Sequence, residues 1–279
     1  MKSINFITIV KAVLFIGFWL TLTGICSRVF SIPLPLFMES PALTEIWYRL
    51  GPFLSMVVVS LLFVFLLDKN IKVRMFPERA DVSILSGLVF GAIWVGGTFG
   101  LLLITDSVVL SGPKTIPDAI FWLIAVLMLV LTQEYLLRGY LFSLLRKSYG
   151  GFVAIIVTSV LYVLLSPSVL EASSLAILIA LAEGVMLGML RVYTGGILSP
   201  LLAHLLWAGF GSLILGTVPT GLYSPSMWET VLTGAEPVTG GALMFSGSAL
   251  CLLVIVILID LSGILMNDKR TRLAATLEE

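Results

Sequence analysis

The feature that most constrains this chain is a series of apolar runs, each long enough to cross a lipid bilayer. A helical crossing takes roughly 20 residues. Hydrophobic residues make up 59% of the 279 residues, charged residues make up 11%, and mean hydropathy is +1.12, whereas a soluble domain is about 25% charged. The sequence therefore predicts an all-α, polytopic membrane helical bundle of about eight transmembrane helices. The runs lie at residues 9–25, 52–67, 84–104, 120–145, 152–170, 175–192, 198–215 and 242–266.

Basic residues outside these runs, or at their very ends, predict how the bundle is oriented. Cytoplasmic segments of membrane proteins carry an excess of Lys and Arg. With the N-terminus inside and eight crossings, only Arg28, Arg49 and Lys114 fall outside. The residues on the cytoplasmic side are Lys2, Lys69, Lys72, Arg74, Arg79, Arg146, Lys147, Arg191, Lys269, Arg270 and Arg272. We therefore expect a multi-pass protein of the cell membrane, a prokaryotic plasma membrane, with both termini in the cytoplasm.

The rest of the sequence predicts a single membrane domain over residues 1–279. The first apolar run has no small-x-small cleavage site after it and is interpreted as a retained anchor. Cys26 and Cys251 lie in or beside apolar runs and predict neither a disulfide nor a metal site. The net charge is zero, which argues against nucleic acid as a partner. The basic loop at residues 68–81 is interpreted as a solvated, lipid-facing connector.

A polar cluster with the sequence QEYLLRG interrupts the fourth apolar run, from Gln133 to Gly139. Glu134 and Arg138 are four residues apart, so a helix places them on one face, close enough to pair. Charge at membrane depth is costly and usually faces the protein interior, where it marks a pathway or a reaction centre. This cluster is therefore the first candidate for a functional site.

Three further polar residues fall within predicted spans, namely Ser166, Glu183 and His204, which is the only histidine. At a rise of about 1.5 Å per residue, Glu134, Ser166 and His204 each lie roughly 14 to 22 Å from the cytoplasmic ends of their helices. They can therefore share one plane, as a single buried site requires. Glu183 is interpreted as a neutral residue or as a partner in an interhelical pair.

These residues also have structural interpretations. Glu134 and Arg138 can form a buried pair that fixes the helix in the bundle, and His204 can be a hydrogen-bonded interior residue. Ser166 precedes Pro167 and can bond a backbone carbonyl that the proline leaves free. A catalytic zinc ion usually has three protein ligands, which one histidine does not supply, so no metal and no cofactor are expected.

Three stretches together resemble the CPBP family of membrane proteins, the CAAX prenyl protease and bacteriocin-processing group. They read QEYLLRGYLF, SVLYVLLS and GMLRVYTGGILSPLLAHLLWAG, in this order along the chain. The family has eight helices and carries the motifs EExxxRG, FxxxH and HxxxN or HxxxD on three of them. The likeness covers about residues 83–261, after N-terminal helices in residues 1–82.

The resemblance implies proteolysis inside the membrane. In the family, the first Glu of EE and the His of FxxxH position and deprotonate a water, the second Glu and the polar residues of the last motif complete the site, and the Arg braces it. The positions that match the family pattern are Glu134, Arg138 and His204. The positions that depart from it are Gln133 for Glu, Tyr162 for Phe, Ser166 for His and Ala208 for Asn.

These departures remove the standard mechanism, because an amide such as that of Gln133 has almost no basicity. General base catalysis contributes about 10²- to 10⁴-fold to a rate, and an oxyanion donor about 10²- to 10³-fold. The expected function is therefore that of a catalytically impaired pseudoprotease that binds a membrane peptide, a lipidated peptide or a partner protein in contact with membrane lipid. One alternative is an active intramembrane protease that uses Glu134 and His204. Another is a proton-relaying carrier, although no repeated halves are visible.

Overall fold

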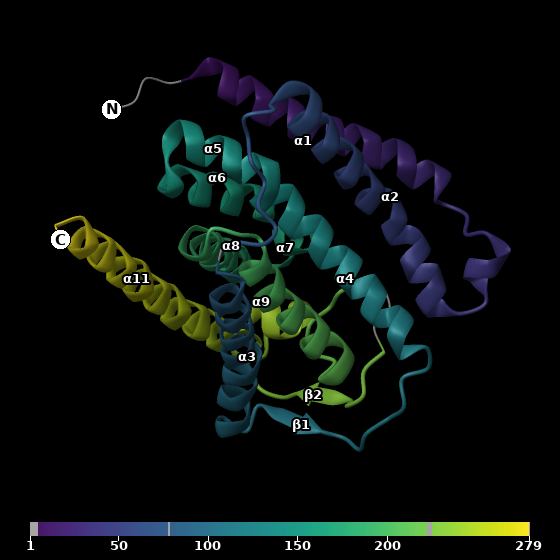
Figure 1. Cartoon of the computed structure of the whole chain (residues 1–279). Helices are drawn as coiled ribbons and strands as arrows, with labels where there is room; N and C mark the ends of the chain where they lie inside the picture. The colour runs from purple at the N-terminus through teal and green to yellow at the C-terminus, as the bar shows by residue number, and fades with distance from the viewer. Residues whose placement is uncertain (1–4, 78, 222–224, 279) are drawn as a thin grey trace.

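The computed structural model describes residues 5–77, 79–221 and 225–278, and residues 270–278 are described by their backbone alone. The chain is an all-α helical bundle, as predicted (Figure 1). In the described residues, six helical segments are long and apolar enough to span a membrane. Two shorter apolar helices, Gly151–Leu164 and Leu198–Ile214, correspond to the fifth and seventh predicted spans. The predicted Lys2 of the cytoplasmic set lies outside the described residues.

The elements follow one another along the chain as a series of helices with two short strands. They are α1 (Phe6–Val29), η1 (Pro35–Met38), α2 (Pro41–Leu61), η2 (Leu62–Leu67), α3 (Ala80–Ile104), β1 (Val108–Leu110), α4 (Ala119–Tyr135), η3 (Leu136–Leu141), α5 (Phe142–Tyr149), α6 (Gly151–Leu164), α7 (Pro167–Ala172), α8 (Ser174–Thr194), α9 (Leu198–Gly209), η4 (Phe210–Ile214), β2 (Thr230–Leu232), α10 (Glu236–Thr239), η5 (Gly241–Gly247) and α11 (Ala249–Glu278).

Two helix boundaries differ from the predicted spans for local reasons. The second helix begins at Pro41, well before the predicted residue 52, because Ser40 caps it by accepting a hydrogen bond from the Leu43 amide and proline is favoured in the first turn. The fifth helix ends at Leu164, before the predicted residue 170. A residue that precedes proline is disfavoured in the α conformation, so the chain breaks at Ser166 and restarts as α7.

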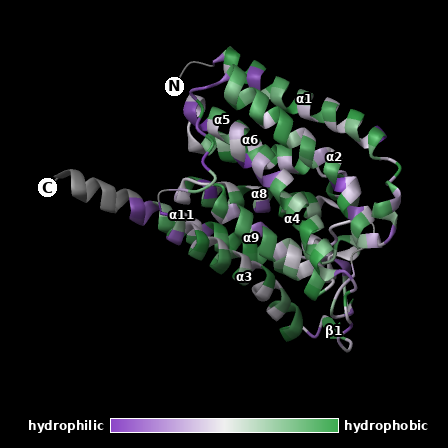
Figure 2. Cartoon of the chain, turned by 45° about the vertical axis from the view of Figure 1, so that its right-hand side comes forward, coloured by the Kyte–Doolittle hydropathy of each residue, from purple (hydrophilic) through white to green (hydrophobic). Residues whose placement is uncertain are grey.

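The helices pack in layers around α4, α8 and α9. The pair α1 and α2 covers one side of α4, and α9 packs on α4 from the bundle interior (Figure 1). Helix α8 packs against α6, α9 and α11, and α3 packs against α9 and α11. The ribbons of the outer helices are mostly in the hydrophobic colour in Figure 2, and large apolar side chains such as Phe18, Leu85 and Ile257 are exposed, which is the arrangement that a lipid environment favours.

Glycines allow two of these helix pairs to approach closely. The four-residue spacing of Gly184 and Gly188 predicts a packing face, and the structure confirms it. A Cβ at Gly184 would lie 2.8 Å from the Ser159 Cα on α6. A second pair, Gly87 and Gly91 on α3, faces α9, where a Cβ at Gly87 would lie 2.6 Å from a backbone oxygen.

The segments that carry most basic residues meet at one end of the bundle. Contacts there join the start of α1, the loop after η2, the turn after α5 and the turn after α8. They are Tyr149 Oη to Asn5 O at 2.7 Å, Lys11 Nζ to Asp68 Oδ2 at 3.0 Å, Ile197 N to Arg74 O at 3.1 Å and Lys269 Nζ to Tyr193 O at 2.8 Å. We call this the basic end. The contacts agree with the prediction that these loops lie on the same side of the membrane. Which side that is stays a prediction.

The opposite end holds a feature that the helical pattern does not predict. Strands β1 and β2 pair antiparallel, with Val109 opposite Val231. Lys114 forms an ion pair with Glu229 beside them. The hydrogen bond from Lys114 and its positive charge lower the pKa of the exposed Glu229 carboxyl.

Candidate functional site

The polar cluster of the fourth span lies at a distortion in the helix. Glu134 is in the last turn of α4, and Arg138 is in η3, a π-helical turn. Gly139 has non-helical backbone angles, with φ −84° and ψ −114°. Single π turns within α-helices occur often at functional sites. The side chains of Glu134 and Arg138 are both 0% exposed, so the distortion holds an acid and a base inside the bundle.

Glu134 joins α4 to α9 through one carboxylate oxygen. Its Oε1 lies 2.8 Å from Nδ1 of His204 and 3.3 Å from Nη1 of Arg138. Arg138 therefore binds the carboxylate through one oxygen rather than two. His204 is 4% exposed, so all three retained family residues form one buried cluster, as their predicted depths allow.

Arg138 extends this cluster to α8 and α6. Its Nη2 donates to the Gly184 carbonyl at 3.4 Å, and its Cζ lies 5.3 Å from the centre of the Tyr162 ring. Tyr162 in turn donates its hydroxyl to Glu183 Oε2 at 3.2 Å. We call His204, Glu134, Arg138, Tyr162 and Glu183 the buried network. It connects four helices, and Glu183 is paired across helices as one of its two interpretations predicts.

Arg191 braces the network from its basic side. Its Nε donates to the Arg138 carbonyl oxygen at 3.1 Å. The residue as a whole is 3% exposed. The sequence places Arg191 on the cytoplasmic side at the end of the sixth run, and α8 continues to Thr194 and buries the side chain in its last turn. What the sequence does not predict is that this end of the helix is buried.

Several buried polar atoms of these residues have no hydrogen-bond partner among the described residues. They are Oε2 of Glu134, Oε1 of Glu183, Nε of Arg138 and Nη1 of Arg191. These two acids and two guanidinium groups thus use only part of their capacity for hydrogen bonds. Buried polar groups without partners are costly. These atoms can therefore form further hydrogen bonds to a group that enters the site.

The imidazole of His204 is held by aromatic rings on its other sides. Trp94 and Trp207 stack at 4.3 Å with an angle of 4° between their planes, and the Trp94 ring lies 6.4 Å from the imidazole. The Tyr162 ring meets the imidazole edge-on at 6.2 Å. Trp94 also donates to Sγ of Cys251 at 3.4 Å. This packing favours the interpretation of His204 as a fixed interior residue.

A cavity of about 190 Å³ lies beside the network, between α1, α2, α4 and α6. Its lining consists of Trp19, Pro52, Leu129, Thr132, Gln133, Leu136, Leu137, Tyr162, Leu165 and Ser166. Three of these, Gln133, Tyr162 and Ser166, are positions where the chain departs from the family pattern. Neither Glu134 nor His204 is among the lining residues, so the retained acid and imidazole do not face this space.

Ser166 lines the cavity but does not join the buried network. Its hydroxyl donates to the Tyr162 carbonyl at 2.8 Å. The predicted bond to a backbone carbonyl is therefore present, but its acceptor is Tyr162, because the Val163 carbonyl four residues before Pro167 accepts from the Ser166 amide at 3.0 Å. The prediction that Glu134, Ser166 and His204 can form one site is therefore met only by Glu134 and His204.

Ala208 lies away from the cavity. It is 3% exposed and packs with Leu201 and Leu213 in an apolar cluster. Its methyl group has none of the hydrogen-bonding capacity of the Asn that the family motif has at this position. Ala208 therefore supplies no oxyanion donor.

An aromatic cluster lies about one helical turn from the cavity, since Phe15 is four residues from Trp19 and Tyr140 is four residues from Leu136. The rings of Phe15, Phe63 and Tyr140 lie 5.0 to 5.3 Å apart, and all three residues are 0% exposed. Tyr140 also donates to Asp68 at 2.9 Å. The family likeness implies a conical cavity open toward the cytoplasm. That cone stays a prediction, and the three rings show that α1, η2 and η3 pack tightly against one another at this level.

The structure brings no three potential metal ligands together in its described part. Glu134 and His204 are in contact, but Glu183 is bonded to Tyr162 rather than directed at the same point. The pairing of Tyr162 with Glu183 is what the sequence missed. Each residue is singled out separately along the chain, and their spacing of 21 residues across two helices carries no signal of contact.

Fold and site together define a multi-pass, all-helical membrane protein with a buried acid, base and imidazole on two of its helical segments. Residues 115–210 match the family described as type II CAAX prenyl endopeptidase Rce1-like. The match confirms the resemblance to the CPBP group over this segment, which contains the buried network and all four departures from the family pattern. No curated protein matches the chain.

Proposed function

We propose that this chain is a CAAX-protease-like membrane protein that binds a membrane peptide, a lipidated peptide or a partner protein without cutting it. The observation that carries the proposal is the separation of the retained residues from the cavity. Glu134 and His204 bind each other at 2.8 Å. The cavity is instead lined by Gln133, Tyr162 and Ser166.

The chemistry of the lining residues supports binding over hydrolysis. The amide of Gln133 can hold a water through a hydrogen bond but cannot accept its proton, and the Ser166 hydroxyl is bonded to a backbone carbonyl. Hydrolysis of a peptide bond needs a base that accepts a proton from the attacking water and hydrogen-bond donors that stabilise the oxyanion. Loss of the base alone lowers the rate of hydrolysis by about 10²- to 10⁴-fold.

The cavity has a size and polarity that suit an apolar client group. Its volume of about 190 Å³ is larger than the roughly 150 Å³ of a dry cavity that holds a benzene-sized ligand. Leu129, Leu136, Leu137 and Leu165 supply most of an apolar wall. Part of an aliphatic side chain or of a lipid modification fits such a space.

Restoring the missing groups tests the proposal. The double variant Gln133→Glu with Ser166→His, purified in a neutral detergent, is assayed on a prenylated peptide tethered to a membrane anchor. Cleavage by the restored variant and none by the unaltered chain supports an inert parent with an intact framework.

A matched control uses the neighbouring lining position, Thr132→Glu with Leu165→His, which adds the same groups at positions that the family motifs do not use. Equal cleavage by the control and the restored variant would indicate contamination or an unspecific effect. Cleavage by the unaltered chain would favour the alternative, an active protease that uses Glu134 and His204.

The membrane location and orientation are part of the same proposal. We place the chain in a prokaryotic plasma membrane with both termini in the cytoplasm, because the basic segments gather at one end and such segments are retained on the cytoplasmic side.

A further inference from the structure

A second cavity, of about 480 Å³, opens at the basic end. Its lining consists of Asn70, Ile71, Lys72, Arg74, Ser143, Arg146, Lys147, Arg191 and Gly195. Five of these nine residues carry a positive charge, and none carries a negative charge. The sequence alone favours a solvated connector for the loop that holds Lys72 and Arg74, but the structure places both on this cavity.

The most buried cation of the cavity has bonding capacity left over. Arg191 is 3% exposed, and its Nη1 has no hydrogen-bond partner among the described residues. The charged side chains that act on it are two further cations, Arg146 and Arg74. Ser143 also lines the cavity with a buried hydroxyl that has no partner among the described residues. A bound anion would reduce the repulsion among these cations and would accept hydrogen bonds from Arg191 Nη1 and the Ser143 hydroxyl.

A phosphate group suits this set of donors. Guanidinium groups bind phosphate oxygens with two parallel hydrogen bonds, and ammonium groups bind them as point charges. The cavity lies where α5 and α8 end and where the loop after η2 crosses the end of the bundle. This is the level of lipid head groups if the apolar helices span the bilayer, and basic pockets between helices at this level bind anionic head groups.

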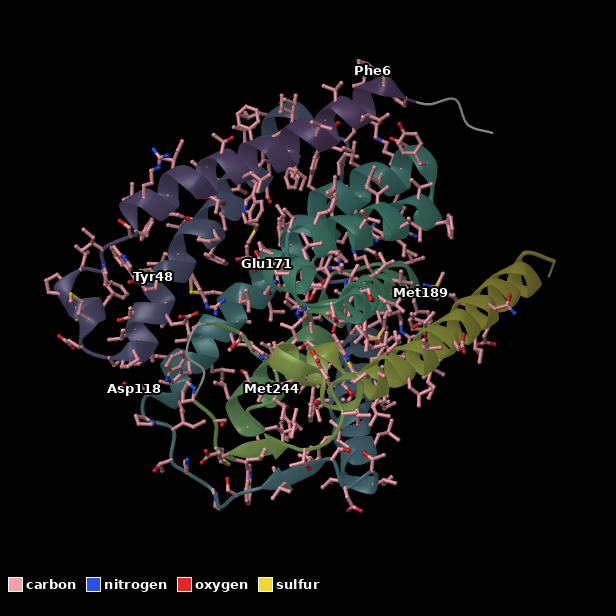
Figure 3. The ribbon with its side chains drawn as sticks, turned by 180° about the vertical axis from the view of Figure 1, so that it is seen from behind. Phe6, Tyr48, Asp118, Glu171, Met189 and Met244 are labelled. Atoms are coloured by element: carbon pink, nitrogen blue, oxygen red, sulfur yellow. The ribbon has the colours of Figure 1, made fainter. Side chains whose placement is uncertain are left out.

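An apolar groove of about 450 Å³ adjoins the basic cavity and distinguishes a lipid from a free anion. It is lined by Arg146, Gly151, Phe152, Ile155, Ile156, Val185, Met189, Val192 and Met266. Arg146 lines both spaces. Met189, labelled in Figure 3, lies on α8 beside α11. A charged cavity and an apolar groove that share one arginine fit an amphiphile with a charged head and an aliphatic chain.

We infer that this end of the protein binds one anionic phospholipid, with the phosphate in the basic cavity and an acyl chain in the apolar groove. Arg191 would then receive the acceptor that its Nη1 lacks, and Arg146 would sit between head group and chain. The site is separate from the cavity of the proposed function, and Arg191 links it to the Arg138 carbonyl at 3.1 Å.

The test uses the full-length protein, delipidated in a neutral detergent, with native mass spectrometry and thermal unfolding as readouts. The probes are phosphatidylglycerol, phosphatidylcholine with the same acyl chains, glycerol 3-phosphate and inorganic phosphate. Phosphatidylglycerol is expected to remain bound as one molecule and to raise the melting temperature. The other three are expected to have no comparable effect at the same concentration.

Two charge variants locate the binding site. Lys72→Gln with Arg146→Gln removes two exposed lining cations and is expected to weaken phosphatidylglycerol binding about 25-fold, at about 5-fold per cation. Lys69→Gln with Arg79→Gln removes two exposed cations of the same end that do not line the cavity, and it is expected to change binding less than about 3-fold.

Each other outcome overturns the inference. Equal weakening by the two variants would mean that the charge of the whole surface attracts the lipid. Equal stabilisation by inorganic phosphate would assign the cavity to a free anion, and equal retention of phosphatidylcholine would remove any role for the cations. Because all four substituted residues are exposed, none of the variants is expected to unfold the protein.

Discussion

Glu134 is the residue on which the buried network depends, because it contacts both His204 and Arg138 with one oxygen. Removing one member of a buried ion pair leaves the other charge without compensation and costs about 3 to 5 kcal/mol. We therefore expect Glu134→Ala to lower the melting temperature in detergent strongly. Glu171→Ala, at an exposed acid of α7, should change it little.

A double substitution separates charge from shape in the same network. Replacing a buried pair by apolar residues of similar size is often neutral, so Glu134→Leu with Arg138→Met should recover much of the stability lost in Glu134→Ala. If Glu134→Ala and Glu171→Ala unfold at the same temperature, the buried pair has no structural role.

Tyr162 supplies the second prediction at the residue scale. Its hydroxyl is the partner of Glu183 Oε2 at 3.2 Å. Tyr162→Phe restores the residue type of the family motif but leaves the buried carboxylate without that partner, at a cost of about 1 to 3 kcal/mol. Thermal unfolding measures the loss. The matched variant Tyr135→Phe, at a half-buried tyrosine, should unfold near the parent, and an equal shift in both would argue against the pairing.

At the scale of the helix, close approach of α3 to α9 depends on Gly87. A Cβ there would lie 2.6 Å from the Ser199 carbonyl oxygen, and crowding of this kind in a packed interior costs about 1 to 3 kcal/mol. We expect Gly87→Ala to unfold at a lower temperature. Gly96→Ala, on the same helix with nothing within 4 Å, should be neutral or stabilising, because alanine favours helix by about 1 kcal/mol over glycine.

The opposite order of stability in these two glycine variants would contradict the packing of α3 on α9. A similar loss in both would mean that the effect comes from the helix itself rather than from its neighbour.

The sequence predicts the helices better than their ends and distortions. Apolar runs place eight helices because the bilayer requires backbone bonds to be satisfied within each span. The break at Ser166 and Pro167 follows from local chemistry that hydropathy does not register. The π turn η3 is not visible in sequence, because one extra residue in a turn leaves the apolar character of the span as a whole unchanged.

The candidate site is predictable only in part for a similar reason. The spacing of Glu134 and Arg138 predicts their contact within one helix. Contacts between helices, such as Tyr162 with Glu183, depend on rotation and register, which no single-sequence periodicity fixes. The burial of Arg191 depends on where α8 ends, and helix ends are the least certain feature of a periodic pattern.

At the scale of the whole molecule, the gathering of basic segments at one end predicts the orientation. Lys69 lies at the basic end and Lys114 lies beside the two strands at the other end. In a variant without Cys26 and Cys251, a cysteine placed at position 69 should react with an impermeant thiol reagent only after the membrane is opened. A cysteine at position 114 should react in intact cells.

Reaction of the cysteine at position 69 in intact cells, with protection at position 114, would invert the proposed topology. Reaction of both positions from one side would contradict the number of crossings between them.

The most direct measurement of the central claim is turnover by the purified, unaltered chain in lipid nanodiscs with a prenylated, membrane-tethered peptide. Because Gln133 and Ser166 line the cavity in place of a base and an imidazole, we expect the peptide to stay bound to the protein and to be recovered uncut. Product that accumulates with the parent chain, and disappears when Glu134→Ala or His204→Ala is introduced, would contradict it.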